Sequence, residues 1–341
     1  MTSLNVYDLN ELLSQAKSQW FQYAVIEVSS HGLSQSRFEW ISFSCAVLTN
    51  ISAEHLDYHE NLDDYAATKK QLFINVVKNK LSQKFAVLPK DDEYGRKRMN
   101  EIIFDKQIDY GISLSSSLKW ENITESLNYT NCDIKYLWKN YALTLKLPGK
   151  FNVYNALAAT GVWILMWLEI EKICQSLANF EPVDGRVNIL THNNIHYIVD
   201  FAHTPAALKA LLDYVNINKS TGKIITVFGA PWLRDIYKRP DMGNIVWHLS
   251  DIVIVSEDDS QSEDVYKIIS DIDNGVGRKE WDNYFIQPSR ETALELALSI
   301  AKEWDIVVCA GKWHERVLLT NYGKIPWNDM NKIKELLHIT E

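Results

Sequence analysis

The chain has 341 residues, enough for two domains, and its 46% hydrophobic and 23% charged residues are typical of a globular protein. The formal net charge of -9 argues against a general nucleic-acid-binding protein, although it leaves room for a local basic site that holds a nucleotide. The N-terminus lacks the basic and then apolar pattern of a signal peptide, and the longest apolar run, residues 161–168, is too short for membrane insertion. The four cysteines form no C-x-x-C pair, so we expect reduced thiols and a cytoplasmic protein.

The first predicted elements are a helix and two strands. Apolar residues on one face predict a helix over residues 8–19. The apolar runs at 23–26 and 45–49 predict two buried strands, each followed by a polar, turn-rich loop.

Side chains that can bind a metal ion follow both strands. Glu27 ends the first strand, and His55, Asp57 and His59 follow the second. In open α/β sheets, ligands gather outside the carboxyl ends of parallel strands, so this pattern predicts one divalent-metal site. A lone histidine after a strand is, by itself, more often a structural residue than a metal ligand.

The next predicted element is a helix over residues 64–73. Its spacing places Lys69, but not Lys70, on an apolar stripe. The stripe comprises Tyr65, Leu72, Phe73 and Val76. An ammonium group on an apolar face loses hydration, so its pKa falls and a neutral amine becomes available for chemistry. The alternative is a lysine whose stem packs while its head reaches water.

Further elements follow in chain order. A strand is predicted at 84–89, a hairpin at 134–146 that turns around Lys139-Asn140, and a helix that begins within 147–159. The segment 181–186 is polar and turn-rich, and we place a domain boundary close to Pro182.

Beyond this boundary, strands and helices alternate as in a parallel sheet covered on both faces. Thr204 suits a helix N-cap and Pro205 the first helical turn. The loops after the strands are expected to converge on one edge. The predicted strands are 197–200, 224–228, 252–255 and 306–309.

Several segments match, in order, the motifs of one family. Residues 27–33 (EVSSHGL), 49–59 (TNISAEHLDYH) and the Lys69 helix resemble the central domain of the Mur ligases. Most similar is the MurE type, which adds the third peptide residue to UDP-MurNAc-dipeptide in peptidoglycan synthesis. The remaining matches are G-x-F-N-x-x-N-x-L-A-A at 149–159, D-F-A-H-T-P at 200–205, R-D-x-x-K-R-P-x-M-G at 234–243 and A-G-K-W-H-E at 310–315.

The resemblance implies an α/β fold with two domains. Residues 1–182 would be a partial central ATPase-type domain, and residues 183–341 a C-terminal Rossmann-like domain with a mostly parallel sheet. The motif that normally cradles ATP phosphates, G-x-x-x-x-G-K-[ST], is not found in the 341 residues. In the family, this P-loop and a uridine-nucleotide-binding domain precede the point that matches Met1.

The resemblance also implies the roles of individual residues. Glu27, His55 and a carbamylated Lys69 would form the catalytic centre and hold Mg²⁺. ATP, the co-substrate, would contact Asn152, Asn155, Arg186, Asp200 and His203. The muramoyl peptide would contact Ser29 and Arg37. The incoming amino acid would contact Arg234, Asp258, Asp259, Gly311 and Glu315.

Three departures from the family pattern bear on these roles. Residues 228–233 replace a glycine-rich turn, and Trp313 stands where the family has glycine, so backbone conformations that need positive φ are affected. The family's D-N-P-R motif reads Asp-Asp-Ser-Gln at 258–261. Without the arginine, the group that recognises a second carboxylate, as in diaminopimelate, is missing, and the extra acid Asp259 is compatible with a cationic side chain such as lysine.

The leading hypothesis is an ATP-dependent ligase in which ATP phosphorylates the peptide carboxylate and the amine of an amino acid attacks the acyl phosphate. One alternative is an inactive binding or scaffold protein of the same fold. Another is a fragment that needs a separate P-loop-bearing polypeptide. For the cluster Arg234, Lys238 and Arg239, the default interpretation from the residues alone is a solvated basic turn.

Overall fold

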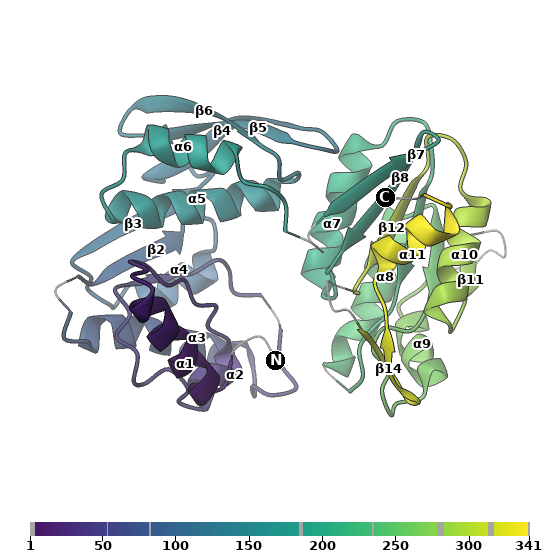
Figure 1. Ribbon diagram of the computed structural model, residues 1–341, viewed down its shortest axis with the longest axis horizontal. Helices are drawn as coiled ribbons and strands as arrows, with labels where there is room; N and C mark the ends of the chain where they lie inside the picture. Colours follow the sequence, from purple (N-terminus) through teal and green to yellow (C-terminus); the bar gives the residue numbers. More distant parts are fainter. Residues whose placement is uncertain are drawn as a thin grey trace. The chain divides into compact units, whose positions relative to one another are not determined.

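The computed structural model describes residues 4–52, 54–81, 83–183, 187–233, 235–277, 283–312 and 317–339 (Figure 1). Contacts between Cα atoms divide the chain into two compact units. The first comprises residues 1–121, 133–141 and 154–175, and the second comprises 122–132, 142–153 and 176–341. The domain boundary at Pro182 remains a prediction.

A six-stranded sheet in the order β1-β2-β3-β4-β5-β6 organises the first half of the chain. The first four strands are parallel neighbours, with Ala46 opposite Ala86 in adjacent strands. The predicted strands at 45–49 and 84–89 are therefore confirmed. The strands are β1 (Cys45–Val47), β2 (Phe85–Pro89), β3 (Lys106–Gly111), β4 (Leu118–Glu125), β5 (Thr130–Tyr136) and β6 (Lys139–Leu145).

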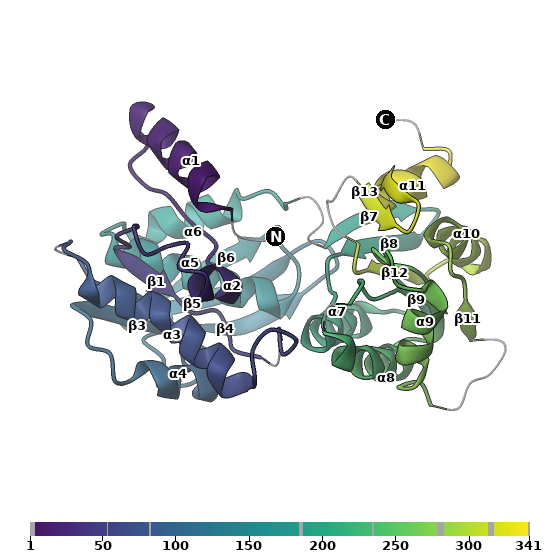
Figure 2. The ribbon, with the colours of Figure 1, turned by 90° about the horizontal axis from the view of Figure 1, so that it is seen from below.

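Helices cover both faces of the parallel part of this sheet (Figures 1 and 2). Alternate residues of a strand face opposite sides. Ala86 and Leu88 of β2 pack against α3 (Leu62–Lys78), whereas Val87 approaches Gly161 of α5 (Lys150–Leu165). A Cβ atom at position 161 would lie 2.8 Å from a Val87 methyl, so glycine lets α5 approach the sheet closely. Two further helices are α4 (Glu93–Met99) and α6 (Ile170–Ala178).

The N-terminal region differs from the prediction in one element. The helix predicted at 8–19 is α1 (Val6–Ser18). The run 23–26 is not a strand, and Val25 is 95% exposed. Ile26 and Val28 instead pack with α1 and with α2 (Ser30–Ser34). The expected buried strand was wrong: the described sheet ends at β1, no strand of it pairs with this run, and the exposure of Val25 shows that the run is not covered on both faces.

The β5–β6 hairpin is present, but its turn lies two residues earlier than predicted. Leu137 and Trp138 form the connection, both with positive φ (47° and 68°), and Lys139-Asn140 begin β6. A two-residue hairpin turn of type I′ requires positive φ at both turn positions, a conformation usually supplied by Asn or Gly. The polar Lys139-Asn140 pair therefore suggested the wrong turn.

The second unit contains a sheet in the order β11-β10-β9-β12-β8-β7, in which only β7, next to β8, is antiparallel among the described pairs. All four strands predicted for this half are confirmed. The strands are β7 (Asn188–His192), β8 (Ile195–Asp200), β9 (Ile224–Phe228), β10 (Ile252–Val255), β11 (Tyr284–Ile286) and β12 (Ile306–Ala310).

Two hydrophobic clusters bury the two faces of this sheet. One joins Ile198 and Val308 to α7 (Pro205–Asn218), α8 (Arg239–Leu249) and α9 (Val265–Asp273). The other joins Tyr197, Val199 and Val307 to α10 (Arg290–Ile300) and α11 (Asp329–Leu336). As predicted, Thr204 caps α7 and Pro205 occupies its first turn. The remaining elements are η1 (Ile236–Lys238), β13 (Val317–Thr320) and β14 (Gly323–Pro326).

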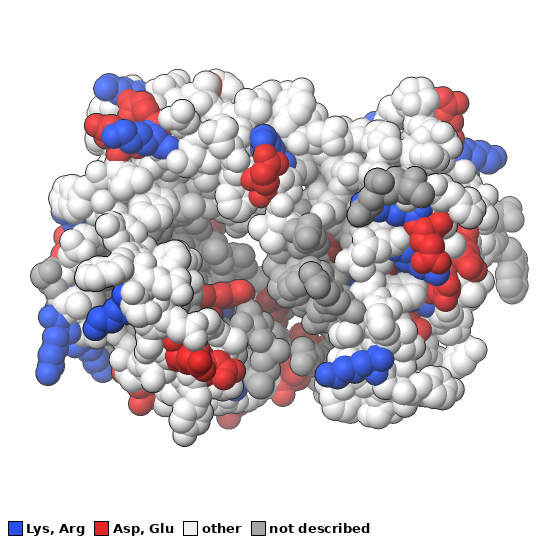
Figure 3. All heavy atoms as spheres, in the orientation of Figure 1, with Lys and Arg blue, Asp and Glu red and all other residues white. Residues whose placement is uncertain are grey.

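The surface carries its charges in small groups of both signs on the face drawn in Figure 3, separated by wide uncharged areas. The described residues on this face therefore form no continuous basic stripe of the kind that binds nucleic acid. Among the described helices, none combines the length and the apolar character that a membrane crossing demands.

Candidate functional site

The loop after β1 is fixed in place by Asp92, which lies between β2 and α4, and by Tyr110 of β3. One Asp92 oxygen accepts the Ile51 N–H at 2.7 Å, and the other accepts the Gly95 N–H at 2.8 Å, which caps α4. The Tyr110 hydroxyl donates to the Leu48 carbonyl at 2.9 Å. The chain that leads to His55 is thereby held at the carboxyl edge of the sheet. Asp92 and Tyr110 were not among the residues predicted from the sequence, although an acid between a strand and a helix is a typical N-cap signal.

Aromatic rings gather where this loop meets α2 and α3. His31 lies 5.0 Å from His55 and 4.0 Å from Tyr58 between ring centroids, and His59 lies 5.2 Å from Tyr65. The sequence predicted that His55 and His59 lie together, and the structure adds His31 from α2. Asp57, by contrast, is exposed.

His59 is the most deeply buried member of this cluster. Its side chain is almost inaccessible, and Nδ1 lies 3.2 Å from a carboxylate oxygen of Asp64 in the first turn of α3. Its Nε2 atom is buried without a hydrogen-bond partner among the described residues. The Asp64 contact fixes the ring, so the imidazole is a packed, oriented group.

Lys69 lies on the buried stripe of α3, as the helical spacing predicted. Tyr65 and Phe73 are buried on the same face, and the Lys69 Nζ lies 5.3 Å from the Tyr65 ring centroid. Burial lowers the pKa of Lys69, and the nearby carboxylates of Glu54 and Glu27 offset part of this decrease. Lys70 points elsewhere and pairs with Glu101 at 2.7 Å. Burial thus favours the neutral amine at Lys69, and the acidic groups beside it act in the opposite direction.

Glu27 is exposed, and its effect on the Lys69 pKa indicates that the two side chains are electrostatic neighbours. In the described ranges, no group of three or more His, Cys, Asp or Glu side chains is arranged to hold a metal ion. The set Glu27, His55 and Lys69 therefore remains a prediction that depends on carbamylation of the lysine.

Ser29 and Arg37, expected to contact a muramoyl peptide, flank α2. The Ser29 hydroxyl accepts the Gly32 N–H at 3.1 Å and so caps this helix. The Arg37 guanidinium contacts Gln35, and its backbone N–H donates to the Gly32 carbonyl at 2.9 Å. These contacts give both residues local structural roles, and their predicted substrate contacts remain untested.

The start of α5 is built on a positive-φ glycine. Gly149 has φ +91° and donates its N–H to the Thr130 hydroxyl at 3.0 Å. The Asn152 amide donates to the Pro148 carbonyl at 2.8 Å, so Asn152 stabilises this turn. Asn155 lies one turn further along the helix and is exposed. Of the two residues predicted near adenine, Asn155 thus has the more accessible side chain.

In the second unit, the loops after β8, β9, β10 and β12 meet at the carboxyl edge of the parallel strands, as predicted. The two Asp200 carboxylate oxygens accept the N–H groups of Ala202 at 2.8 Å and Val187 at 2.9 Å. The His203 Nδ1 lies 2.9 Å from the Phe201 carbonyl oxygen, and these two rings pack 4.2 Å apart. Asp200 and His203, predicted to bind ATP, therefore also shape the loop in which they lie.

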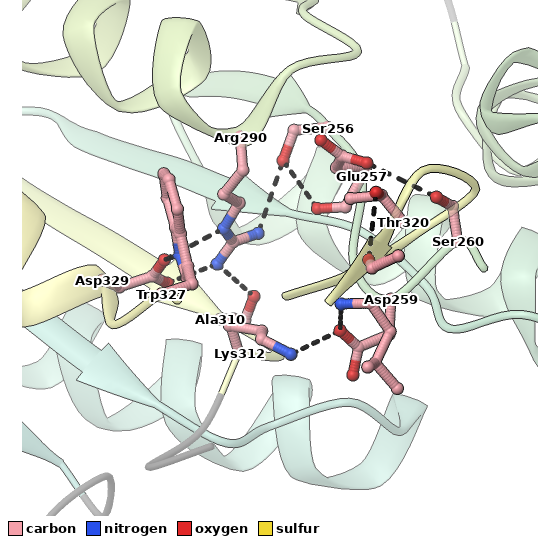
Figure 4. A network of polar contacts seen from close by, with 12 residues as sticks. Ser256, Glu257, Asp259, Ser260, Arg290, Ala310, Lys312, Thr320, Trp327 and Asp329 are labelled. Atoms are coloured by element: carbon pink, nitrogen blue, oxygen red, sulfur yellow. Dashed lines mark hydrogen bonds and ion pairs between the residues drawn. The ribbon is translucent and has the colours of Figure 1, made fainter. Parts of the chain in front are cut away.

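Arg290 connects the ends of three elements at this edge (Figure 4). Its guanidinium is fully buried, donates to both Asp329 oxygens at 2.6 and 3.3 Å, and donates to the Ala310 carbonyl at 3.0 Å. It also lies 3.4 Å from the Ser256 hydroxyl. The carboxylate of Asp329 raises the pKa of Arg290 against the opposing effect of burial. Arg290 thus joins β10, β12 and α11.

Asp258 and Asp259, which share one loop, have different environments. Lys312 Nζ lies 2.5 Å from Asp259 Oδ1, which also accepts the Leu319 N–H at 2.8 Å (Figure 4). Asp258 is buried, which raises its pKa to about 6, and Gly311 packs directly against it. A Cβ atom at position 311 would lie 2.6 Å from an Asp258 oxygen, and Gly311 has φ +98°. Glycine is therefore required there on both steric and conformational grounds.

The basic cluster at 234–239 is not simply a solvated turn. Arg239 is fully buried and binds both oxygens of Glu263, at 2.8 and 2.9 Å, as well as Asp271 at 2.8 Å. Glu263 also accepts the Leu233 N–H at 2.9 Å. The default interpretation was wrong for Arg239, because the acids that surround it come from distant positions in the chain.

Comparisons with known proteins are consistent with this geometry. Residues 1–163 match the Mur ligase middle domain, and residues 185–313 match the Mur ligase glutamate ligase domain. The UDP-N-acetylmuramoyl-L-alanyl-D-glutamate–2,6-diaminopimelate ligase 1 of Clostridium acetobutylicum is 34% identical over 333 residues, which cover 97% of this chain and 67% of that protein. The chain belongs to the Mur ligase family.

Two further Mur ligases resemble the chain over nearly its whole length. The corresponding ligase of Clostridium botulinum is 34% identical, with 97% of this chain and 66% of that protein covered. A solved structure of a ligase with the same activity name superposes with a TM-score of 0.65 at 26% identity, covering 98% of this chain and 68% of the other. The chain thus spans about two thirds of the length of the Mur ligases that it matches.

Three predicted site residues lie outside the described residues. They are Arg186, Arg234 and Glu315. Trp313, which replaces a glycine of the Mur ligase motif, also lies outside them. Their predicted contacts with ATP and with the amino acid therefore remain sequence-based predictions.

Proposed function

We propose that this chain provides the central and C-terminal parts of a cytoplasmic, ATP-dependent ligase that adds an amino acid to UDP-MurNAc-dipeptide. The observation that carries the proposal is the environment of Lys69, whose pKa is lowered by burial and which has Glu27 and Glu54 as charged neighbours. The names of the Mur ligases that are about one third identical support the reaction class. The product would be a lengthened peptide of the peptidoglycan precursor.

Lys69 would act after carbamylation. Its neutral amine adds to CO₂ to form an N–C bond, and one proton leaves to solvent. The resulting carbamate is an anion with two oxygen donors, whereas an ammonium group offers none. The lowered pKa favours this step because only the neutral amine reacts.

Magnesium would be held by Glu27, His55 and the carbamate. The donor set of the described residues fits this ion once Lys69 supplies its oxygens, since Mg²⁺ prefers oxygen ligands and takes one or two carboxylates beside phosphate and water. When bound, the ion would supply positive charge against the phosphoryl group. The oriented rings of His31 and His59 would keep the His55 loop in place.

The remaining roles follow the Mur ligase pattern. Ser29 and Arg37 would contact the muramoyl peptide. ATP would contact Asn152, Asn155, Arg186, Asp200 and His203. The amino acid would be held by Arg234, Asp258, Gly311 and Glu315. Asp259 is already engaged by Lys312, so we no longer expect it to select a cationic side chain directly.

The phosphate loop would be supplied by another polypeptide segment, because the 341 residues contain no G-x-x-x-x-G-K-[ST]. The test is to mix the purified chain with a separately produced P-loop polypeptide from the Clostridium botulinum ligase, and to add ATP, Mg²⁺, UDP-MurNAc-dipeptide and single amino acids. Release of ADP together with a product of the expected mass would support the proposal. Lys69→Ala should abolish product formation, whereas Lys70→Ala should not.

An absence of product in every mixture, despite a well-formed complex, would contradict ligase activity. It would favour the alternative of a binding or scaffold protein that keeps the Mur ligase fold. Mass spectrometry of the intact protein in bicarbonate, with Lys69→Arg as the control, would report carbamylation separately from turnover.

A further inference from the structure

Arg290 is a fully buried cation at the start of α10, close to the candidate amino-acid site. Asp329, in the first turn of α11, supplies the matching charge, because its two oxygens accept from the guanidinium at 2.6 and 3.3 Å. The Trp327 Nε1 donates to the same carboxylate at 2.7 Å and fixes it in place (Figure 4). The guanidinium is therefore held in one orientation, with donors left for other groups.

One of these donors reaches the peptide at which the chain leaves β12. The Arg290 Nη2 donates to the Ala310 carbonyl at 3.0 Å, and Nη1 lies 3.4 Å from the Ser256 hydroxyl, just after β10 (Figure 4). The N–H of the same peptide, which belongs to Gly311, donates to the Asp200 carbonyl of β8 at 3.1 Å. In a trans peptide these two groups point in opposite directions, so the peptide is held from both sides.

The Arg290 contact supplies a donor where the ladder between two strands ends. β12 pairs with β8 as far as Ala310, which lies opposite Asp200. Its described register with β9 ends one residue earlier, at Cys309 opposite Val227. The Ala310 carbonyl points away from β8, toward the side on which the β9 ladder has ended. A buried carbonyl that lacks a donor is costly, and an arginine from a separate helix provides this donor.

The orientation of this peptide matters because the chain turns sharply directly after it. Gly311 has φ +98°, and a Cβ atom there would lie 2.6 Å from an Asp258 oxygen. Glycine adopts positive and negative φ about equally readily, so its own backbone does not fix the turn. The contacts of the preceding peptide fix it, together with the ion pair between Lys312 and Asp259 on the following residue.

The guanidinium also acts on Asp258 through its charge. Burial raises the pKa of Asp258, and the charge of Arg290 is the largest effect that lowers it. Asp258 and Gly311 are the two described groups near Arg290 that are expected to hold the amino acid. Because the guanidinium has no exposed surface, it influences both groups without a contact to the substrate.

We propose that Arg290 is a positioning residue of the ligase site, and that it orients the 310–311 peptide so that Gly311 and Asp258 can hold the incoming amino acid. For the identity of the bound group, the inference rests on the proposed function. The orientation of the peptide itself rests on the contacts of Arg290 with α11 and with the end of β12.

The alternative is that Arg290 only links α10 to α11. The chain offers a matched control, since Glu291 of α10 pairs with Lys332 of α11 at 2.6 Å. Glu291→Gln removes this ion pair between the same two helices and leaves Arg290 unchanged. Arg290→Lys keeps a positive charge beside Asp329, but a single ammonium group lacks the fork of donors that also reaches the Ala310 carbonyl.

The first measurement is amide hydrogen exchange of the full chain, resolved by residue. In Arg290→Lys, the Gly311 amide should exchange about tenfold faster relative to the amides of β9, which corresponds to the loss of one hydrogen bond. In Glu291→Gln, this ratio should stay at its wild-type value. A ratio that is unchanged in Arg290→Lys would overturn the proposal, because the peptide would then keep its orientation without the guanidinium.

A second variant serves if Arg290→Lys does not fold. Arg290→Gln combined with Asp329→Asn removes both buried charges together, which is less costly than the removal of one partner. We expect the same faster exchange at Gly311 from this double variant. An unchanged ratio would overturn the proposal here as well.

The third measurement is turnover in the mixture with the P-loop polypeptide, with L-lysine and diaminopimelate as the amino acid in turn. Arg290→Lys should raise KM for the amino acid about tenfold and leave KM for ATP unchanged. KM for ATP is expected to stay the same because the Asp200 carboxylate is held by N–H groups of Ala202 and Val187. Equal changes in both KM values, or no change in either, would overturn the positioning role.

Exchange and turnover also separate this proposal from the proposed function. An absence of product with wild type and Glu291→Gln alike contradicts the ligase, and the exchange ratio at Gly311 then decides whether Arg290 holds the turn. Product formed equally well by wild type and Arg290→Lys, at equal KM values, supports the ligase and overturns the positioning role.

Discussion

Lys312 Nζ lies 2.5 Å from Asp259 Oδ1, and the lysine side chain is almost completely buried. The pair links the end of β12 to the loop after β10, and Asp259 also holds β13, because it accepts the Leu319 N–H at 2.8 Å. A buried cation that loses its partner is costly, since the attraction that offset its desolvation is gone while the burial remains. The negative charge of Asp259 thus stabilises the fold by pairing with the buried Lys312.

Asp259→Asn should therefore reduce the free energy of unfolding by about 3 kcal/mol. Asparagine keeps an oxygen for the Leu319 N–H, so the loss reports the charge and not the hydrogen bond to the backbone. Urea unfolding near neutral pH measures it. The double variant Asp259→Asn with Lys312→Met should recover most of the stability, because the uncompensated charge is removed. Equal losses in the single and double variants would contradict a role for the ion pair.

Asp258 should make stability depend on pH in the opposite sense to an ordinary ion-paired acid. Burial raises its pKa from 3.8 to about 6, so between these values the folded protein retains a proton that the unfolded chain has lost. Its contribution to stability therefore falls as pH rises through this window. Asp258→Asn removes the effect, so its stability relative to wild type should increase by about 2 kcal/mol between about pH 4 and pH 7.

The measurement is urea unfolding of wild type and Asp258→Asn across that pH range. Glu60→Gln serves as the control at an exposed acid. A stability difference for Asp258→Asn that stays constant with pH would show that the Asp258 carboxyl titrates alike in the folded and unfolded chains.

Local sequence signals were enough to predict the strands that are buried on both faces of the sheet, and the start of α7. The strands β8, β9, β10 and β12 were predictable because continuous apolar runs followed by turns are typical of buried parallel strands. The cap and first turn of α7 were predictable because Thr204 and Pro205 act on their immediate neighbours. The stripe that carries Lys69 follows from helical spacing alone.

The features that sequence reasoning missed depend on distant partners. Arg239 is buried because Glu263 and Asp271 surround it, and nothing local indicates these contacts. Residues 23–26 have the composition of a buried strand, but no strand among the described residues pairs with them. The contact of His31 with His55 joins α2 to the loop after β1, and only the folded chain reveals that these two segments are close.

Lys69 provides a test of the candidate centre that does not require substrates. Burial lowers its pKa below that of the unfolded chain, so the unfolded state binds more protons and stability rises with pH as the folded amine loses its proton. Lys69→Met removes the desolvated cation. We expect it to be more stable than wild type near neutral pH, and the difference to shrink as pH approaches 10.5, the ordinary value for lysine.

Thermal or urea unfolding at several pH values checks this expectation. Lys70→Met is the control on the same helix, because Lys70 pairs with Glu101 at 2.7 Å on the helix surface. Surface pairs contribute about 0.5 kcal/mol, so Lys70→Met should cause only a small loss. A Lys69→Met protein that is less stable than wild type at neutral pH would indicate that its carboxylate neighbours, Glu27 and Glu54, outweigh burial.

Arg239 and Glu263 should control the order of the loop that precedes α8. Arg239→Lys keeps the positive charge but cannot bind both Glu263 oxygens and Asp271 at once, because an ammonium group lacks the planar fork of donors. We expect a loss of roughly 3 kcal/mol in the free energy of unfolding.

The Leu233 amide should also exchange faster, since its acceptor, Glu263, is no longer held in place. Hydrogen exchange resolved by residue measures this, with Lys267→Arg as a control. The contradicting outcome is a variant that is less stable but whose Leu233 amide exchanges no faster than the lower global stability alone explains. Arg239 would then stabilise the core without ordering the loop.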